Sequence, residues 1–157
     1  MSAFPDPEVA AGTVVVAETG LGRFSEVLLD GRHRFIADEP KASGGDDTGP
    51  NPYELLLMSL GACTAMTLRL YAGQKKWPLE RVVVHLTHRK IYAQDCADCE
   101  TREGKLDRIE RRIELHGQLD EAQRQRLVEI ADKCPVHNTL TSEVKIDTQL
   151  IERGLSA

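Results

Sequence analysis

Two cysteines, Cys63 and Cys134, occupy opposite kinds of sequence context, and a pair of this kind is suited to a thiol–disulfide redox cycle. Cys63 lies inside an apolar run that extends from Leu55 to Met66. Cys134 lies at a chain break, directly before Pro135, which disfavours a helical conformation at the residue preceding it. A buried thiol that is oxidised to a sulfenic acid can condense with a second thiol to form a disulfide. We therefore expect Cys63 to be the deeply held thiol and Cys134 to reach it from a hinge-like junction.

The plain structural interpretation of Cys63 stays open beside the redox one. A cysteine in an apolar helix is commonly a small core residue. Apolar surroundings also raise the pKa of a thiol, so a reactive Cys63 needs a cation close to it in space. Three arginines on expected turns or strands are the candidates: Arg23, Arg34 and Arg111.

Composition excludes several classes of function. The chain has 157 residues and a formal net charge of -5, and its basic residues are interspersed with acidic ones, so no nucleic-acid partner is expected. The longest apolar run lies near Leu55 to Met58 and extends, with interruptions, to Leu70. Arg69 and small polar residues make it too short and too mixed for a membrane span. The N-terminus lacks the basic and apolar segments of a signal peptide, so we expect a cytoplasmic protein. The length fits one domain over residues 1–157, with a loose tail over residues 1–11.

The first part of the chain has the pattern of an antiparallel sheet. Runs rich in β-branched and apolar residues predict strands over residues 13–17, 24–29 and 32–37. Asp30 and Gly31 separate the last two runs and predict a two-residue type I′ turn. Residues 40–50 form a polar, glycine-rich segment, for which we expect a mobile loop.

The clearest helix start in the chain follows this loop. Asn51 is a good N-cap, Pro52 fits the first helical position, and Glu54 lies where a capping box needs an acidic residue. We expect the helix to end near Ala72, with Gly73 as its stop. Its residues are apolar on nearly every face, which predicts a central core helix.

The remaining elements complete an α+β domain. We expect strands over residues 81–92, 109–116 and 143–150, and a short helix over residues 136–140. Asp120 is a good N-cap for a further helix that runs to Lys133, with Leu127, Ile130 and Ala131 as its inner stripe. This order of elements predicts antiparallel sheets packed on a central helix.

Two separated segments resemble the signatures of the OsmC/Ohr family, the osmotically inducible and organic hydroperoxide resistance proteins. The first segment is NPYELLLMSLGAC, which ends at Cys63, and the second is ADKCPVH, which contains Cys134. The resemblance spans roughly Thr13 to Leu150, including the order of elements. The pattern is most similar to the YhfA-type branch of OsmC-like proteins.

The resemblance implies a fold, a chemistry and a set of partners. It implies an OsmC-like α+β fold, in which antiparallel sheets wrap a long central helix, and an intertwined homodimer with active sites at the interface. It implies that Cys63 is the peroxidatic cysteine and Cys134 the resolving one, with a dithiol as reductant and no metal or organic cofactor. The implied substrate is an organic or fatty-acid hydroperoxide, since apolar walls around a thiolate favour organic peroxides.

The resemblance also implies an acid–arginine pair beside the peroxidatic cysteine. The family glutamate directly follows the Asn-Pro pair, but Tyr53 holds that position here and Glu54 lies one residue later. One residue is about 100° of rotation on a helix, so Glu54 cannot simply replace that glutamate, and a capping role is its alternative. Arg23 follows the turn where the family arginine falls. The candidate catalytic residues are therefore Cys63, Cys134, Arg23 and Glu54.

A second pair of cysteines, Cys96 and Cys99, is absent from the typical enzymes of the family. A Cys-x-x-Cys pair supplies half of a tetrahedral zinc site. His85 and His88 precede it, but residues three apart on a strand face opposite sides, so only one of them could join. Three acidic neighbours oppose thiolate formation in this pair: Asp95, Asp98 and Glu100. A loop feature without catalytic duty, a metal or regulatory redox site and direct redox catalysis all stay open, which leaves Cys96 and Cys99 as weak metal candidates.

Together these features predict a thiol-dependent peroxide reductase that serves oxidative-stress defence. The alternative is a module of the same fold that senses redox state or binds a hydrophobic ligand without turnover. His137, near Cys134, has two interpretations: a base or positive neighbour of the thiol, or a hydrogen-bonded structural histidine.

Overall fold

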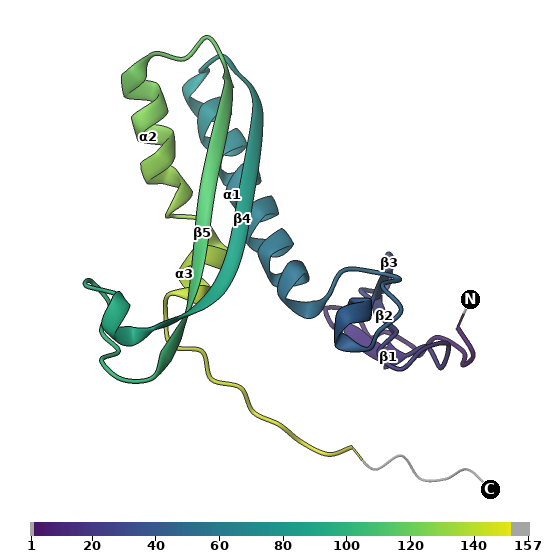
Figure 1. Ribbon diagram of the computed structural model, residues 1–157. Coiled ribbons are helices and arrows are strands. Elements are labelled where there is room, and N and C mark those ends of the chain that lie inside the picture. The colour runs from purple at the N-terminus through teal and green to yellow at the C-terminus, as the bar shows by residue number, and fades with distance from the viewer. Residues whose placement is uncertain (1, 152–157) are drawn as a thin grey trace, which may run out of the picture. The chain divides into compact units, whose positions relative to one another are not determined.

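Antiparallel strands and helices make up the part of the chain that the computed structural model describes, residues 2–151 (Figure 1). The α+β fold with antiparallel sheets and a central helix is confirmed. In chain order the elements are β1 (Val15–Glu18), β2 (Glu26–Leu29), β3 (Arg34–Ala37), η1 (Lys41–Ser43), α1 (Pro52–Lys75), β4 (Leu79–Tyr92), η2 (Ala93–Asp95), β5 (Lys105–Gly117), α2 (Glu121–Ala131) and α3 (Pro135–Leu140).

The chain divides into two compact units. The first comprises Met1–Gly61 and His85–Arg112, and the second comprises Ala62–Val84 and Ile113–Ala157. The boundaries fall within α1, β4 and β5, so these three elements contribute residues to both units. The single domain expected over residues 1–157 stays a prediction.

The three-stranded antiparallel sheet expected near the N-terminus is confirmed, with β2 between β1 and β3. The predicted two-residue turn between β2 and β3 is wrong, because Leu29 pairs with Arg34 and four residues connect the strands. Of these four, which the structure describes, only Gly31 has a positive φ, 85°, whereas a type I′ turn needs two such residues. The Asp30 carboxylate instead accepts the backbone N–H of Arg32 at 2.9 Å and that of His33 at 2.6 Å. These two bonds stabilise a wider turn.

A buried carboxylate organises the glycine-rich loop of the first unit. Asp38 is only 2% exposed. Its Oδ2 accepts the backbone N–H groups of Asp46 and Thr48 at 3.2 Å each and the Thr48 hydroxyl at 2.9 Å, and its Oδ1 accepts the N–H of Glu39 at 2.8 Å. Burial by itself raises the pKa of Asp38, but these donors outweigh it and hold the pKa below its ordinary value. The loop therefore depends on an ionised carboxylate.

α1 begins with the capping box that the sequence predicts. The Asn51 side chain accepts the backbone N–H of Glu54 at 3.0 Å, and the Glu54 carboxylate accepts the backbone N–H of Asn51 at 2.8 Å. Pro52 is the first helical residue, where its missing N–H costs nothing. The start of α1 therefore follows from three residues that act locally.

α1 ends later than predicted, because Gly73 lies inside the helix and Lys76 terminates it. Lys76 has a φ of 56°, and its backbone N–H donates to the carbonyl of Gly73 at 3.1 Å. The N–H of Trp77 donates to the carbonyl of Ala72 at 2.9 Å, which completes a Schellman motif. The Trp77 ring packs edge-on against Tyr71, with ring centroids 5.6 Å apart. Packing of the tryptophan, and not the glycine, therefore sets the helix end.

β4 and β5 form a long two-stranded hairpin (Figure 1). Both strands extend beyond the ranges that the sequence predicts, 81–92 and 109–116. β5 ends at Gly117, whose φ of 127° is rarely adopted by residues with side chains. A Cβ atom at this position would lie 2.1 Å from the carbonyl oxygen of Pro78. Only glycine therefore allows the two backbone segments to approach this closely.

The core of the second unit forms between the later part of α1, α2 and the adjoining strand ends. Leu68 and Leu127 are fully buried at its centre. The predicted inner stripe of α2 is confirmed, as Leu127, Ile130 and Ala131 are all buried. α2 also begins at its predicted cap: the Asp120 side chain accepts the N–H of Gln123 at 2.8 Å, and the Gln123 side chain accepts the N–H of Asp120 at 3.0 Å.

α1 is not buried on nearly every face, which corrects the prediction made from its composition. Met66 and Leu70, four residues apart and thus neighbours on one face, are 71% and 64% exposed. By length and composition α1 is also apolar enough to cross a membrane, a test that core helices of soluble proteins pass too. The absence of a membrane partner therefore stays a prediction.

The strand predicted over residues 143–150 is wrong for this chain, because residues 143–151 form neither strand nor helix. Val144, Ile146 and Leu150 of this segment are 54%, 83% and 89% exposed. A strand is stable only where a neighbour accepts its backbone hydrogen bonds. Within residues 2–151 no other strand pairs with this segment.

Candidate functional site

The two cysteines with redox potential, Cys63 and Cys134, meet in the second unit. Cys63 lies on α1, and Cys134 is the N-cap residue of α3. Their thiols are free and hydrogen-bonded to each other. We call these two residues the thiol pair. The two sulfurs lie near disulfide distance, although almost half the chain separates the two residues in sequence.

The burial of the thiol pair is the reverse of the predicted one. Cys134 is fully buried, at 0% exposure, whereas Cys63 is only half-buried. The chain break before Pro135 therefore does not bring Cys134 to the surface. It turns the chain so that the Cys134 sulfur points into the core, while α1 leaves Cys63 partly accessible. Of the two cysteines, Cys63 is therefore the more accessible to solvent.

Hydrogen bonds prepare Cys134 to carry negative charge. Burial by itself raises the pKa of the Cys134 thiol. The backbone N–H of His137 donates to Sγ at 3.3 Å, and the Cys63 thiol and the hydroxyl of Thr64, 3.9 Å away, donate to it as well. These donors outweigh burial, and the pKa of Cys134 lies below its ordinary value of 9.0. Cys134 therefore ionises more readily than an ordinary cysteine thiol.

Two features of this site escaped the sequence analysis. Thr64 is fully buried and donates to Cys134, and Cys134 itself caps α3 through its sulfur. The Cys134-Pro135 dipeptide carried the signal for the cap, since proline favours the first helical position and the residue before it is then the cap. Thr64 gave no sequence signal beyond its position next to Cys63.

His137 takes part in the site through its backbone. Its N–H is one of the donors to Cys134. Its ring Nδ1 lies 4.0 Å from the Asp132 carboxylate, and both interpretations of this imidazole stay predictions.

The predicted activating residues belong to the first unit and have local partners there. Glu54 closes the capping box of α1, as its alternative interpretation held. The Arg23 guanidinium lies over the ring of Phe24, 4.9 Å from its centroid, and Arg34 pairs with Asp6 at 3.0 Å. The catalytic roles of Arg23 and Glu54 stay predictions, as does the choice of cation for Cys63.

The second cysteine pair forms a disulfide. Cys96 and Cys99 are joined within the β4–β5 connection, with their Cα atoms 5.5 Å apart. Asp98 lies beside them, and the three side chains form a group within 4.8 Å of one another, close enough to hold a metal ion. The two predicted histidines are not part of this group.

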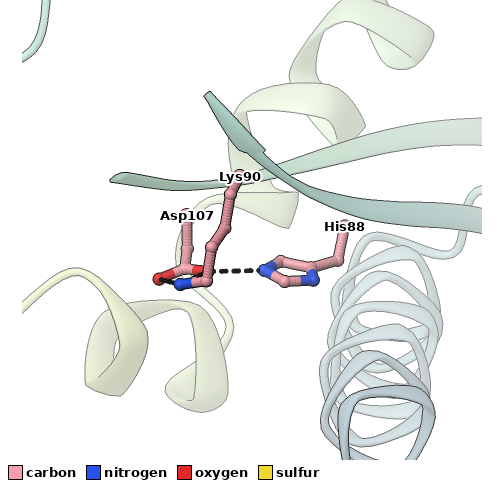
Figure 2. Close-up of polar contacts among 3 residues, drawn as sticks. All are labelled: His88, Lys90 and Asp107. Carbon is pink, nitrogen blue, oxygen red and sulfur yellow. Dashed lines mark hydrogen bonds and ion pairs between the residues drawn. The ribbon is translucent and has the colours of Figure 1, made fainter. Parts of the chain in front are cut away.

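His88 is instead part of a polar cluster on β4 and β5. Its Nε2 lies 2.7 Å from the Asp107 carboxylate, which also accepts from Lys90 at 2.9 Å (Figure 2). The hydrogen bonds from Lys90 and His88 lower the pKa of Asp107, and the Asp107 bond in turn raises the pKa of Lys90. The other face of this histidine is stacked on Tyr53, with ring centroids 4.4 Å apart. Tyr53 occupies the position of the family glutamate, and its ring stacks on His88.

The Tyr53–His88 stack lines a pocket of about 330 Å³ in the first unit. The remaining lining residues are both polar and apolar: Glu39, Pro40, Ser43, Asn51, Glu54 and Leu57.

Comparison with known proteins agrees with this geometry. Residues 44–149 match the family model described as OsmC-like protein. A search of curated proteins gave no match. Similar solved structures include an OsmC-like protein from Mycoplasma pneumoniae, with 23% identity, a TM-score of 0.60, and 87% of this chain and 89% of that chain covered.

Two further similar structures carry names that refer to peroxides. One is an organic hydroperoxide resistance protein OsmC from Legionella pneumophila, with 21% identity, a TM-score of 0.58, and 84% and 91% of the two chains covered. Another is an organic hydroperoxide resistance protein from Elizabethkingia anophelis with thiocyanate bound, with 20% identity, a TM-score of 0.60, and 82% and 86% covered. At these identities the structural likeness establishes the fold.

The match to the family model covers most of the chain and includes both members of the thiol pair. The resemblance found in the sequence is thus confirmed at the level of the family, while the YhfA-type branch stays a prediction. The chain belongs to the OsmC-like protein family.

Proposed function

We propose that the protein is a thiol-dependent reductase of organic hydroperoxides, with Cys63 as the peroxidatic and Cys134 as the resolving cysteine. The observation that carries this proposal is the hydrogen bond between the two thiols, one half-buried and one fully buried. The names of the related hydroperoxide resistance proteins support the same chemistry. An external dithiol serves as the reductant.

The chemistry balances in three steps. The Cys63 thiolate attacks the terminal peroxide oxygen, the O–O bond breaks, and the alkoxide takes a proton and leaves as an alcohol. The Cys134 thiolate then attacks the sulfur of the Cys63 sulfenic acid, the S–O bond breaks, and the hydroxyl takes a proton from solvent and leaves as water. The external dithiol reduces the resulting disulfide and becomes a disulfide itself. The lowered pKa of Cys134 favours the second step, since that step needs a thiolate.

Cys63 requires its own activation before the first step. In the reduced pair the Cys63 thiol donates a hydrogen bond to Cys134, and it must lose this proton before it can attack a peroxide. We infer that a guanidinium approaches Cys63 during the cycle and that Arg23 supplies it, with Glu54 as its acidic partner. Arg23→Ala should slow peroxide consumption, whereas Arg34→Ala, which removes a guanidinium held by Asp6, should not. An equal effect of both variants would argue against the assignment.

Cumene hydroperoxide provides the direct test of the function. Reduced protein mixed with one equivalent of peroxide should lose the thiols of Cys63 and Cys134 together, as counted by alkylation and mass spectrometry. Cys63→Ser should lose no thiol rapidly, and Cys134→Ser should stop at a sulfenic acid on Cys63 that over-oxidises. The matched control is the Cys96→Ser/Cys99→Ser variant, which keeps the thiol pair. Wild-type rates in Cys63→Ser would sink the proposal.

A second candidate function is a stoichiometric redox sensor. Glu54 is engaged in the helix cap and Tyr53 in the stack on His88, so no described contact links an acidic residue of this segment to a catalytic arginine. Weak activation would favour one oxidation over repeated cycles. Steady-state assays with a dithiol distinguish the two functions, because an enzyme turns over many peroxides per chain and a sensor turns over one.

We also propose that the working form is a homodimer. Two apolar surfaces lack cover within residues 2–151: the α1 face that carries Met66 and Leu70, and the extended segment 143–151. An extended segment with alternating apolar side chains is suited to pair with a strand of a second copy. Sedimentation equilibrium should give twice the chain mass, and a monomer at micromolar concentration would contradict the proposal. The cytoplasmic location stays a prediction.

A further inference from the structure

The connection between β4 and β5, residues 93–104, carries chemistry that the proposed peroxidase cycle does not use. We call it the CxxC loop. Its ends are held together by the backbone N–H of Ala93, which donates to the carbonyl of Gly104 at 2.9 Å. Cys96 and Cys99 form a disulfide within it and are both half-buried, while Ala97 and Asp98 between them are exposed. The two sulfurs therefore lie where another protein can reach them.

This disulfide contributes little as a structural crosslink. The stabilisation that a crosslink gives rises with the length of chain that it closes, and this one spans only two intervening residues. Both cysteines also lie in a connection that strand pairing already closes. A disulfide that is accessible and contributes little to stability is typical of a redox-active couple rather than of a structural crosslink.

The charge of the CxxC loop sets the direction in which such a couple works. The loop is acidic, because it contains one basic residue, Arg102, and four acidic ones: Asp95, Asp98, Glu100 and Glu103. Oδ1 of Asp98 lies 3.4 Å from Sγ of Cys96, so a thiolate formed at Cys96 on reduction faces this carboxylate. Negative charge nearby disfavours thiolates and keeps the thiols protonated. A couple whose thiolate is destabilised favours the disulfide, which makes its dithiol form a strong electron donor.

Metal binding is the competing interpretation, and the donor set argues against it. The only described group of this kind has three members, Cys96, Asp98 and Cys99, whereas structural zinc takes four protein ligands. The adjoining strand β4 carries His85 and His88, and neither belongs to this group. His88 is held by Asp107 and Tyr53. The sulfurs themselves are bonded to each other.

We propose that Cys96 and Cys99 form a second dithiol–disulfide couple that exchanges electron pairs with a protein dithiol of the Cys-x-x-Cys kind. A thiolate of the partner attacks one loop sulfur, the loop S–S bond breaks, and the departing loop sulfur takes a proton. The partner's second thiolate then attacks its own mixed-disulfide sulfur, and the remaining loop sulfur leaves and takes a proton. Two electrons have passed to the loop, and the partner is now a disulfide. The reverse sequence passes them on.

The test uses the full-length Cys63→Ser/Cys134→Ser variant, in which Cys96 and Cys99 are the only cysteines left. This background makes the outcome independent of the peroxidase proposal. The variant is mixed with purified thioredoxin at fixed ratios of dithiol to disulfide, quenched with acid, alkylated and weighed by mass spectrometry. Reduced and oxidised samples should converge on the same ratio, with the loop disulfide favoured. Asp98→Asn in this background should raise the loop dithiol-to-disulfide ratio roughly threefold.

Two results would overturn the proposal, and a third would overturn the part assigned to Asp98. Samples that keep their starting redox state in the folded protein, but exchange in denaturant, would make the disulfide a structural crosslink. Zinc retained through dialysis by the reduced variant, at one ion per chain or per two chains, and lost in Cys96→Ser/Cys99→Ser, would make the loop a metal site. An unchanged ratio in Asp98→Asn would remove the role given to the loop charge. Should the double variant fold poorly, peptide mapping of the Cys96–Cys99 fragment from wild-type protein gives the same ratio.

Discussion

The hydroxyl of Thr64 lies 3.9 Å from the sulfur of Cys134, although the two residues are seventy positions apart in the chain. Both are fully buried. Thr64 directly follows Cys63 on α1 and donates to Cys134. The same turn of α1 therefore carries one cysteine of the thiol pair and a hydrogen-bond donor to the other. This arrangement links the acidity of Cys134 to the packing of α1 and makes it open to test by substitution.

Thr64→Val removes this donor with little change of shape, and we expect the pKa of the Cys134 thiol to rise. Loss of one buried hydrogen bond should also lower the free energy of unfolding by about 1 kcal/mol. Thiolate absorbance as a function of pH, in a background that retains only Cys134, measures the first effect. Thr67→Val, one turn further along α1, is the control and should leave the titration unchanged.

The stability of the reduced protein should rise with pH across the titration of Cys134. Its pKa is lowered in the folded state, so the unfolded chain binds more protons between that value and the ordinary 9.0, and the free energy of unfolding grows with pH there. The contribution is complete above the ordinary value and is lost as pH falls through the folded one. Urea unfolding at a series of pH values measures this slope, and Cys134→Ser should flatten it. An identical slope in that variant would assign the effect to other groups.

Acid should loosen the loop that Asp38 organises. The pKa of Asp38 is lowered in the fold, so its stabilising effect is complete above the ordinary carboxyl pKa and is lost as pH falls through the folded value. Asp38→Asn should produce the loosened loop at neutral pH, because an amide nitrogen cannot accept the N–H groups of Asp46 and Thr48. Hydrogen exchange at these two amides is the measurement. Asp47→Asn, an exposed carboxylate of the same loop, should exchange as the wild type does.

Leu68 and Leu70 are two residues apart on α1 and should respond differently to truncation. Leu68 is fully buried, so Leu68→Ala should cost about 2–5 kcal/mol in the free energy of unfolding. Leu70 is 64% exposed, and Leu70→Ala should change the monomer by less than about 0.5 kcal/mol. Under the dimer proposal Leu70→Ala instead weakens self-association, which sedimentation at decreasing protein concentration detects. Equal losses in dilute monomer would contradict the exposure of Leu70.

Local chemistry explains which parts of the fold the sequence predicts. The starts of α1 and α2 are set by Asn51 and Asp120, whose side chains bind backbone groups three residues away, so both caps are visible in the sequence. The end of α1 is set by the packing of Trp77 against Tyr71, and Gly73 misled the prediction because a glycine inside a helix carries the same local signal as one after it. Contacts between residues that meet only in the folded core produce no local pattern from which they can be predicted.

The candidate site shows the same division. Its two cysteines were found from local sequence, but their order of burial was reversed, because the depth of a side chain depends on what the rest of the chain packs over it. The extended segment 143–151 has the alternation of a strand and no partner strand within the described residues. Under the dimer proposal a strand of a second copy supplies the missing partner, which the sequence of one chain does not specify.

Gly117 has no chemistry of its own, yet it constrains how this gene can change. Every amino-acid-altering mutation of a glycine codon introduces a Cβ atom, and here that atom would meet the Pro78 carbonyl oxygen at 2.1 Å. Codon randomisation at this position, followed by selection for soluble product, should return glycine alone. Backbone geometry alone therefore prevents substitution at Gly117, a residue with no assigned role in catalysis.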